Sequence, residues 1–115
     1  MEILRPEQQV MQAALEVRST RAELLAGNVA NADTPGYVAR DLKFTDALNS
    51  VLDSGDSSSA TPEAVVSPEN MRYDRNDIDL NQQMAKAYEN SLNYVATLKL
   101  YGDSMGRLRS ATSSS

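Results

Sequence analysis

The feature that most constrains the fold is a seven-residue repeat in the last third of the chain. Mostly apolar side chains recur there through four heptads: Met84 and Ala87, Ser91 and Tyr94, Leu98 and Tyr101, and Met105 and Leu108. A repeat this persistent predicts a long, nearly straight helix that packs along its length against other helices. Asp79 and Gln82 resemble a capping box. We therefore expect a helix over about 79–110, with fraying in the serine-rich residues 110–115.

A second long helix is expected near the start of the chain, over about residues 6–31. Pro6 suits a first helical position, where a missing N–H costs nothing. Apolar side chains then recur at helical spacing: Leu4, Met11, Leu15, Ala22, Leu25 and Val29. Arg18 lies at the edge of this stripe. The two patterns together predict a helix-packing seam made of Leu15, Leu25, Val29, Met84, Tyr94, Leu98, Tyr101, Met105 and Leu108.

The first helix is followed by an unusual stretch, Asn28-Val29-Ala30-Asn31-Ala32-Asp33-Thr34-Pro35-Gly36-Tyr37. Pro35-Gly36 fits the centre of a type II turn, because proline fixes φ at the first central position and glycine tolerates positive φ at the second. Asparagine at a helix end can cap the last carbonyl groups. A plain cap is the simpler interpretation. Two asparagines before a tight turn also indicate a segment that folds back over the helix.

The middle of the chain is expected to be mostly irregular. Residues 37–40 are typical of an extended segment, and Thr45 can cap a short helix that ends near Leu52. Phe44 precedes Leu48 by four residues, which indicates either a staple-like contact or a short linear motif for another protein. Residues 53–77 show no sustained period and predict a flexible acidic loop, with a brief strand at 64–66.

Composition excludes several classes of function. The chain has neither cysteine nor histidine, so it lacks thiolate chemistry, the commonest general base and the commonest metal ligand. Its net charge is −5, and no basic stretch suggests nucleic-acid binding. We expect no enzymatic activity, no cofactor and no small-molecule substrate. Without a signal-peptide pattern or a membrane-length apolar run, these signals alone indicate the cytosol.

Acidic residues in the middle of the chain raise two further possibilities. With Asp77 as the first calcium ligand, Gln82 stands where an EF-hand loop needs glycine, and Tyr88 where it needs glutamate. A pair of carboxylates could also cleave glycosides, but no aromatic-lined pocket is apparent around them. A solvated loop with acids near a helix start is the favoured interpretation.

The expected fold is therefore all-α. Long N- and C-terminal helices pack as a coiled-coil-like pair, with an irregular middle segment in a single domain over residues 1–115. Two such helices bury little surface at this length, so they need partners to cover the rest of their apolar stripes.

Beyond these patterns, the chain resembles the flagellar rod, hook and axial protein family. The resemblance rests on residues 28–37 with Ala39-Arg40-Asp41 and Phe44, and on Asn76-Asp77-Ile78-Asp79-Leu80 followed by Met84-Ala85-Lys86 and Asn90-Ser91-Leu92-Asn93-Tyr94. The continuation from Tyr37 to Phe44 is similar to the B-type members of the proximal rod. One departure is Gln83, where the family usually has glutamate.

The resemblance implies a structural subunit of the basal-body rod, at its cell-proximal end. Asn28, Asn31, Thr34, Pro35, Gly36 and Tyr37 would form the assembly motif, and Phe44 with Leu48 an export-gate signal. The implied partners are other copies of the chain, other proximal rod proteins, the rod-base adaptor protein, the MS ring and the type III export gate. Export would need no cleaved signal, so the resemblance replaces the cytosolic prediction. The alternative is a cytosolic coiled-coil adaptor or secretion chaperone.

Overall fold

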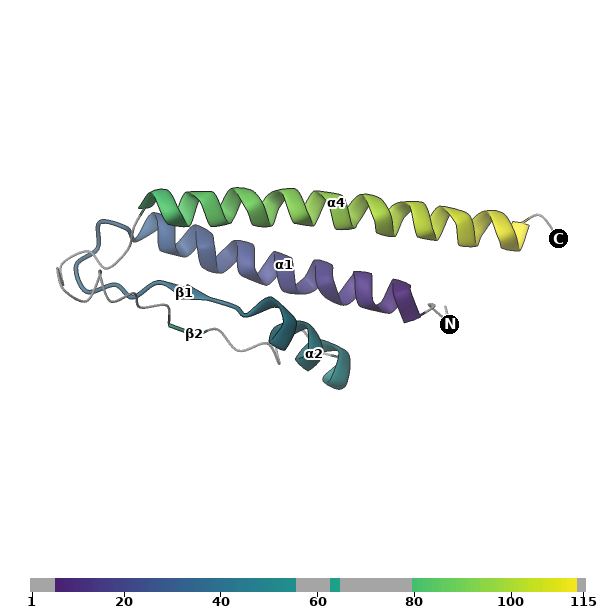
Figure 1. The fold of residues 1–115 in the computed structure, drawn as a ribbon, viewed down its shortest axis with the longest axis horizontal. Helices are drawn as coiled ribbons and strands as arrows, with labels where there is room; N and C mark the ends of the chain where they lie inside the picture. The colour runs from purple at the N-terminus through teal and green to yellow at the C-terminus, as the bar shows by residue number, and fades with distance from the viewer. Residues whose placement is uncertain (1–5, 56–62, 65–79, 114–115) are drawn as a thin grey trace.

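The computed structural model describes residues 6–55, 63–64 and 80–113. The molecule is elongated, 65 × 25 × 18 Å, and is built on two long helices (Figure 1). Helix α1 spans Pro6–Ala30 and helix α4 spans Leu80–Ser113. Between them lie strand β1 (Arg40–Asp41), helix α2 (Phe44–Ser54) and strand β2 (Glu63–Ala64).

The two long helices lie side by side and run antiparallel (Figure 1). Gln8, near the start of α1, bonds to Ser104 near the end of α4, whereas Asn28, near the end of α1, bonds to Gln83 near the start of α4. The predicted all-α fold, with long terminal helices packed as a coiled-coil-like pair, is therefore confirmed.

Helix α1 is the central element, because α2 packs on the side of α1 away from α4 (Figure 1). Apolar residues of α1 and α2, with Leu42 from the link between β1 and α2, meet there in a core cluster. Its members are Ala13, Val17, Leu42, Ala47 and Val51, flanked by Leu24, Phe44 and Leu48. Among the described residues, only four buried apolar side chains are larger than alanine: Val17, Leu25, Leu42 and Val51. Each contributes about 1.5–3 kcal/mol on burial, so apolar burial within one chain is modest.

The predicted extended run is short in the structure. Strands β1 and β2 pair antiparallel, with Arg40 opposite Ala64 and Asp41 opposite Glu63. Of the strand expected at 64–66, Ala64 lies in β2, and residues 65–66 fall outside the described ranges. So do most of the predicted acidic loop and the acids considered as calcium ligands at 74–79.

The start and end of α2 differ from the prediction. The helix begins at Phe44, and Lys43 occupies the N-cap position, where its side chain makes no capping hydrogen bond, so Thr45 is not the cap. The helix also continues past Leu52 to Ser54. It ends at Gly55, whose left-handed conformation (φ 74°) lets its N–H donate to the carbonyl of Val51 at 2.7 Å. Glycine adopts this geometry without a Cβ clash, which explains the later end.

Helix α4 begins at Leu80 and extends to Ser113, three residues beyond the expected end. The fraying predicted from residue 110 onward is therefore wrong for residues 111–113, since lengthening a formed helix avoids the cost of a new nucleus. The predicted capping box depends on Asp79, which lies outside the described ranges. Neither α1, α2 nor α4, as far as the structure describes them, is long and apolar enough to cross a membrane.

Candidate assembly site

The turn after α1 has the geometry that its sequence predicts. The N–H of Tyr37 donates to the carbonyl of Thr34 at 3.2 Å, which closes a four-residue turn with Pro35 and Gly36 at its centre. Gly36 has a φ of 79°, as the second central position of a type II turn requires. Tyr37 then packs on Ala32 and Ala39. Its hydroxyl lies over α1, where a Cβ placed on Gly27 would be 3.6 Å away. The segment thus folds back over the helix end.

Asn31 closes the end of α1. Its backbone N–H and its side-chain Nδ2 both donate to the carbonyl of Gly27, at 3.0 and 2.8 Å. Its Oδ1 accepts from the hydroxyl of Thr34 at 3.2 Å, and its carbonyl accepts from the N–H of Thr34 at 2.9 Å. Asn31 is therefore the cap, and it also holds the start of the turn.

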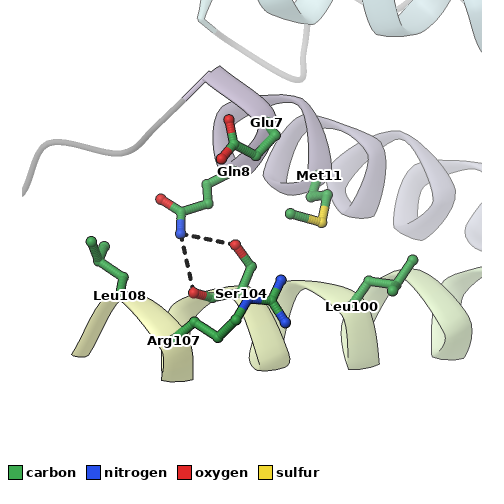
Figure 2. A pocket seen from close by; sticks show the side chains of 7 residues that line it. All are labelled: Glu7, Gln8, Met11, Leu100, Ser104, Arg107 and Leu108. Atoms are coloured by element: carbon green, nitrogen blue, oxygen red, sulfur yellow. Dashed lines mark hydrogen bonds between the residues drawn. The ribbon is translucent and has the colours of Figure 1, made fainter. Parts of the chain in front are cut away.

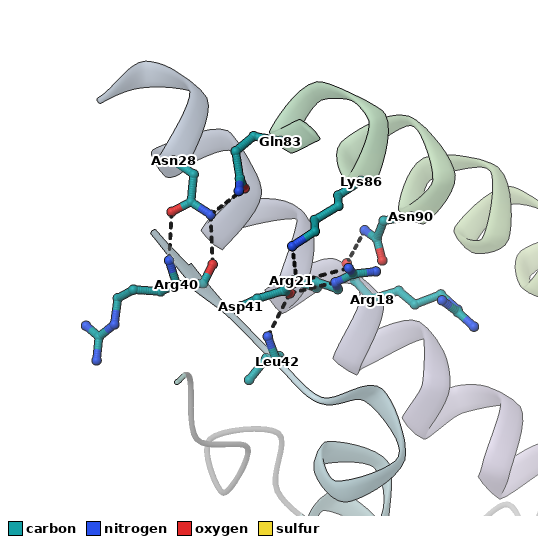
Figure 3. A network of polar contacts seen from close by, with 9 residues as sticks. All are labelled: Arg18, Arg21, Asn28, Arg40, Asp41, Leu42, Gln83, Lys86 and Asn90. Carbon is teal, nitrogen blue, oxygen red and sulfur yellow. Dashed lines mark hydrogen bonds and ion pairs between the residues drawn. The ribbon is translucent and has the colours of Figure 1, made fainter. Parts of the chain in front are cut away.

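Asn28 has a different role from Asn31, because it joins three elements. Its side chain is 1% exposed. Oδ1 accepts from the N–H of Arg40 at 3.0 Å, and Nδ2 donates to the carbonyl of Arg40 at 2.8 Å and to Oε1 of Gln83 at 2.9 Å (Figure 3). The amide pairs with Arg40 as a neighbouring strand would, and it connects β1 with the start of α4. This contact goes beyond a helix cap.

Asp41, next along β1, forms the second connection between these elements (Figure 3). Arg21 of α1 binds it in a bidentate manner, with Nε 2.7 Å from Oδ1 and Nη2 3.0 Å from Oδ2. The N–H of Leu42 donates to Oδ1 at 2.7 Å, and Nζ of Lys86 on α4 lies 3.9 Å from Oδ2. Both Arg21 and Asp41 are mostly buried, with side chains 15% and 13% exposed.

The electrostatics of this pair favour its charged form. Burial by itself raises the pKa of Asp41, but hydrogen bonds from Arg21 and the N–H of Leu42, with the charges of Arg21 and Lys86, hold that pKa below its ordinary value. The hydrogen bond to Asp41 raises the pKa of Arg21 against the opposing effect of burial. Bidentate arginine–carboxylate pairs are among the stronger hydrogen-bonded contacts. The pair therefore holds β1 against α1.

Two further polar contacts cross between α1 and α4. Nδ2 of Asn90 donates to the carbonyl of Arg18 at 2.9 Å (Figure 3). Near the other end, Nε2 of Gln8 donates to the hydroxyl of Ser104 at 3.0 Å, beside a pocket of about 280 Å³ (Figure 2). Gln83, Asn90 and Ser104 are all buried, although they are polar.

These buried residues define the face of α4 that meets α1. Gln83, Asn90, Thr97 and Ser104, here called the polar row, recur every seven residues. Ala87, Tyr94, Tyr101 and Leu108 lie beside the polar row and are half-buried. Two residues of the predicted seam, Met84 and Leu98, are instead 54% and 48% exposed. Gln83, Asn90 and Ser104 occupy the contact because they make interhelical hydrogen bonds, whereas the hydroxyl of Thr97 donates to the carbonyl of Asn93 within α4. Half of the apolar pattern is therefore replaced at the contact by the positions one residue earlier.

The other predicted seam residues lie closer to the contact. Leu25 is fully buried, whereas Leu15, Val29 and Met105 are half-buried. The two residues of the predicted export motif lie together on α2. Phe44 and Leu48 are half-buried against the core cluster, and the Arg18 guanidinium carbon lies 4.1 Å from the centroid of the Phe44 ring. A staple-like role for Phe44 at the start of α2 fits this packing.

The sequence analysis did not single out Gln8, Arg21 and Ser104, and it named Asp41 and Asn90 only within the motifs that carry the family resemblance. The seven-residue spacing of polar side chains in α4 was a signal that could have identified Asn90 and Ser104. The chain has no histidine or cysteine, and within the described ranges its acidic side chains form no group of three or more that could hold a metal ion. The site joins chain segments, and its chemistry is that of hydrogen bonds and of ion pairs from Arg21 and Lys86 to Asp41.

Several known proteins are similar to this sequence over most of its length, although no family model matches the chain. The flagellar basal body rod protein FlgB of Aeromonas hydrophila is 36% identical, over 89% of this chain and 89% of its own length. FlgB of Salmonella typhimurium is 34% identical, over 82% of this chain and 83% of its own. FlgB of Escherichia coli is 33% identical, over 76% and 78%. The chain belongs to the FlgB family of flagellar basal body rod proteins.

Proposed function

We propose that the chain is a non-enzymatic structural subunit of the proximal rod, which assembles through its terminal helices at the cell-proximal end of the rod. The observation that carries this proposal is the distribution of exposed apolar side chains. Among the described residues, ten large apolar side chains are exposed, and all but Val10, Val38 and Leu52 lie on α4. A helix that keeps this much apolar surface in water is typical of a protein–protein interface.

The contacts around Asn28 support a role for residues 28–37 in assembly. Asn28 and the Arg21–Asp41 pair fix β1 and the turn against both long helices. The turn residues Asp33, Thr34, Pro35 and Gly36 are themselves exposed. A rigid, exposed turn at one end of an elongated subunit is a suitable contact for the next subunit along an axis.

The proposed partners follow from this position in the rod. They are other copies of the chain, other proximal rod proteins, the rod-base adaptor protein, the MS ring and the export gate. The chain would reach the periplasmic side of the inner membrane through the type III apparatus, without a cleaved signal. Phe44 and Leu48 would be read by the gate before α2 packs on α1, because both are half-buried in the folded chain.

Co-purification tests this proposal. A tagged chain expressed from its own promoter should appear in detergent-extracted basal bodies, with little left in the cytosolic fraction. Its retention in the cytosol, bound to other exported chains, would instead support an adaptor or secretion chaperone. A variant with Asn28 and Asp41 both replaced by alanine, which loses both side-chain connections between β1 and the long helices, should be depleted from the basal bodies.

A further inference from the structure

A groove lies between the two long helices, beside Asn90 of the polar row. Its volume is about 240 Å³. Arg18, Asn90 and Tyr94 line it. The rest of its lining consists of small side chains from both helices: Ser19, Ala22, Ala26, Ala87 and Ser91. Small residues let a further helix approach closely, since its side chains can enter the space that they leave.

A buried polar group at this groove lacks a partner. Asn90 is 1% exposed, and its Nδ2 donates to the carbonyl of Arg18. Its Oδ1 accepts no hydrogen bond within the described part of the chain, and Nε of Arg18 likewise makes none there. Buried polar atoms are almost always satisfied in a complete assembly. Both residues line the groove, so this is where the single chain is incomplete.

An apolar surface that fits such a groove is present on the same chain. The outer apolar row of α4 consists of large side chains that are 42–69% exposed: Leu80, Met84, Tyr88, Leu92, Val95 and Leu98. Ser91 of the groove lies one helical turn from both Tyr88 and Val95, so the row runs along the rim of the groove. One face of the molecule therefore carries both a depression of small residues and a ridge of large ones.

We propose that this groove receives the outer apolar row of a second copy of the chain. This interface rests on the proposed function, since it identifies one contact by which the subunits assemble. The two surfaces are different, so the contact is heterologous: each copy uses its groove for one neighbour and its row for another. Such contacts propagate along an axis unless they close into a ring.

Two variants, each with a matched control, separate the two surfaces. Ala22→Leu fills the groove, and Ala96→Leu makes the same change at an exposed alanine of α4 outside it. The double variant Tyr88→Gln/Val95→Gln removes the row, and Leu100→Gln removes a similarly exposed apolar side chain from another face of α4. Because all of these residues are exposed or line open space, each variant at high dilution should have the same helix content as the dilute wild-type chain, which circular dichroism can verify.

Sedimentation velocity over a concentration series then tests the proposal. Wild type and the two controls should self-associate, whereas the groove and row variants should each associate roughly tenfold or more weakly, as overpacking or loss of an interface predicts. A mixture of the groove and row variants should form a one-to-one pair that does not grow, because only one intact contact remains.

Three results would overturn the proposal: Ala22→Leu self-associates like wild type, the mixture forms no pair, or wild type stays monomeric throughout. In the last case the groove belongs to a different partner. The proposed function fails by a different result, namely absence of the tagged chain from basal bodies.

Discussion

Asn28 provides the sharpest test of how the chain is held together. Asn28→Ala removes three hydrogen bonds, two to Arg40 and one to Gln83. It leaves Oε1 of the buried Gln83 without this donor. At about 1 kcal/mol for each bond, with a higher cost for a polar group left buried and unpaired, the expected loss is ~3 kcal/mol. That loss corresponds to a change of roughly 100-fold in the unfolding equilibrium.

Two matched substitutions show whether this loss is specific. Asn31→Ala removes the bond to the carbonyl of Gly27 and a solvent-exposed bond from the hydroxyl of Thr34, so about 1 kcal/mol is expected. Asn49→Ala, at an exposed position of α2, should change the free energy of unfolding by no more than ~0.5 kcal/mol.

The free energies can be measured by circular dichroism in urea. Because residues 6–55, 63–64 and 80–113 bury few large apolar side chains, a series in a stabilising osmolyte keeps each variant folded at the start of the titration. An Asn28→Ala loss no larger than that of Asn31→Ala would refute the conclusion that Asn28 connects β1 and α4.

Three further outcomes are expected. The depressed pKa of Asp41 means that this residue stabilises the fold above its ordinary, unfolded-state pKa, and that this stabilisation is lost as the pH falls through the lower folded-state pKa. Asp41→Asn should therefore lower stability at neutral pH and flatten the acid limb of the stability curve; an unchanged acid limb would contradict the assignment. Phe44→Ala should reduce secretion while helicity changes little, whereas Leu52→Ala, at an exposed apolar position of the same helix, should secrete normally; normal secretion of Phe44→Ala would leave only the packing role. The dilute wild-type chain should show a broad, weakly cooperative thermal unfolding transition, and its helix content should rise on assembly. A stable, cooperatively unfolding monomer would contradict this expectation.

The helices were predictable because their patterns are local. Apolar spacing in residues 6–31 and 84–108 indicates helices whatever the rest of the chain does, and Pro35-Gly36 specifies its own turn. The late end of α2 was less visible, because it depends on Gly55 entering the left-handed region. Thr45 is a good cap by residue type, but the chain enters the helix one residue before it.

The contact face of α4 could not be read from apolarity alone. The heptad pattern selects the largest apolar side chains, and Met84 and Leu98 satisfy it. In the folded chain, Gln83, Asn90 and Ser104 occupy the contact instead, because each finds a hydrogen-bond partner on α1. These partners lie 55 to 96 residues away in sequence, so their pairing is visible only in the fold. The apolar row is then left for contacts outside the single chain.

The most direct test of the central claim is rod assembly in cells that lack this chain. The account predicts that assembly stops at the base of the rod, with the MS ring present and no rod above it, and that expression of the wild-type chain restores the rod. Rods of normal length and composition in cells without the chain would contradict the account.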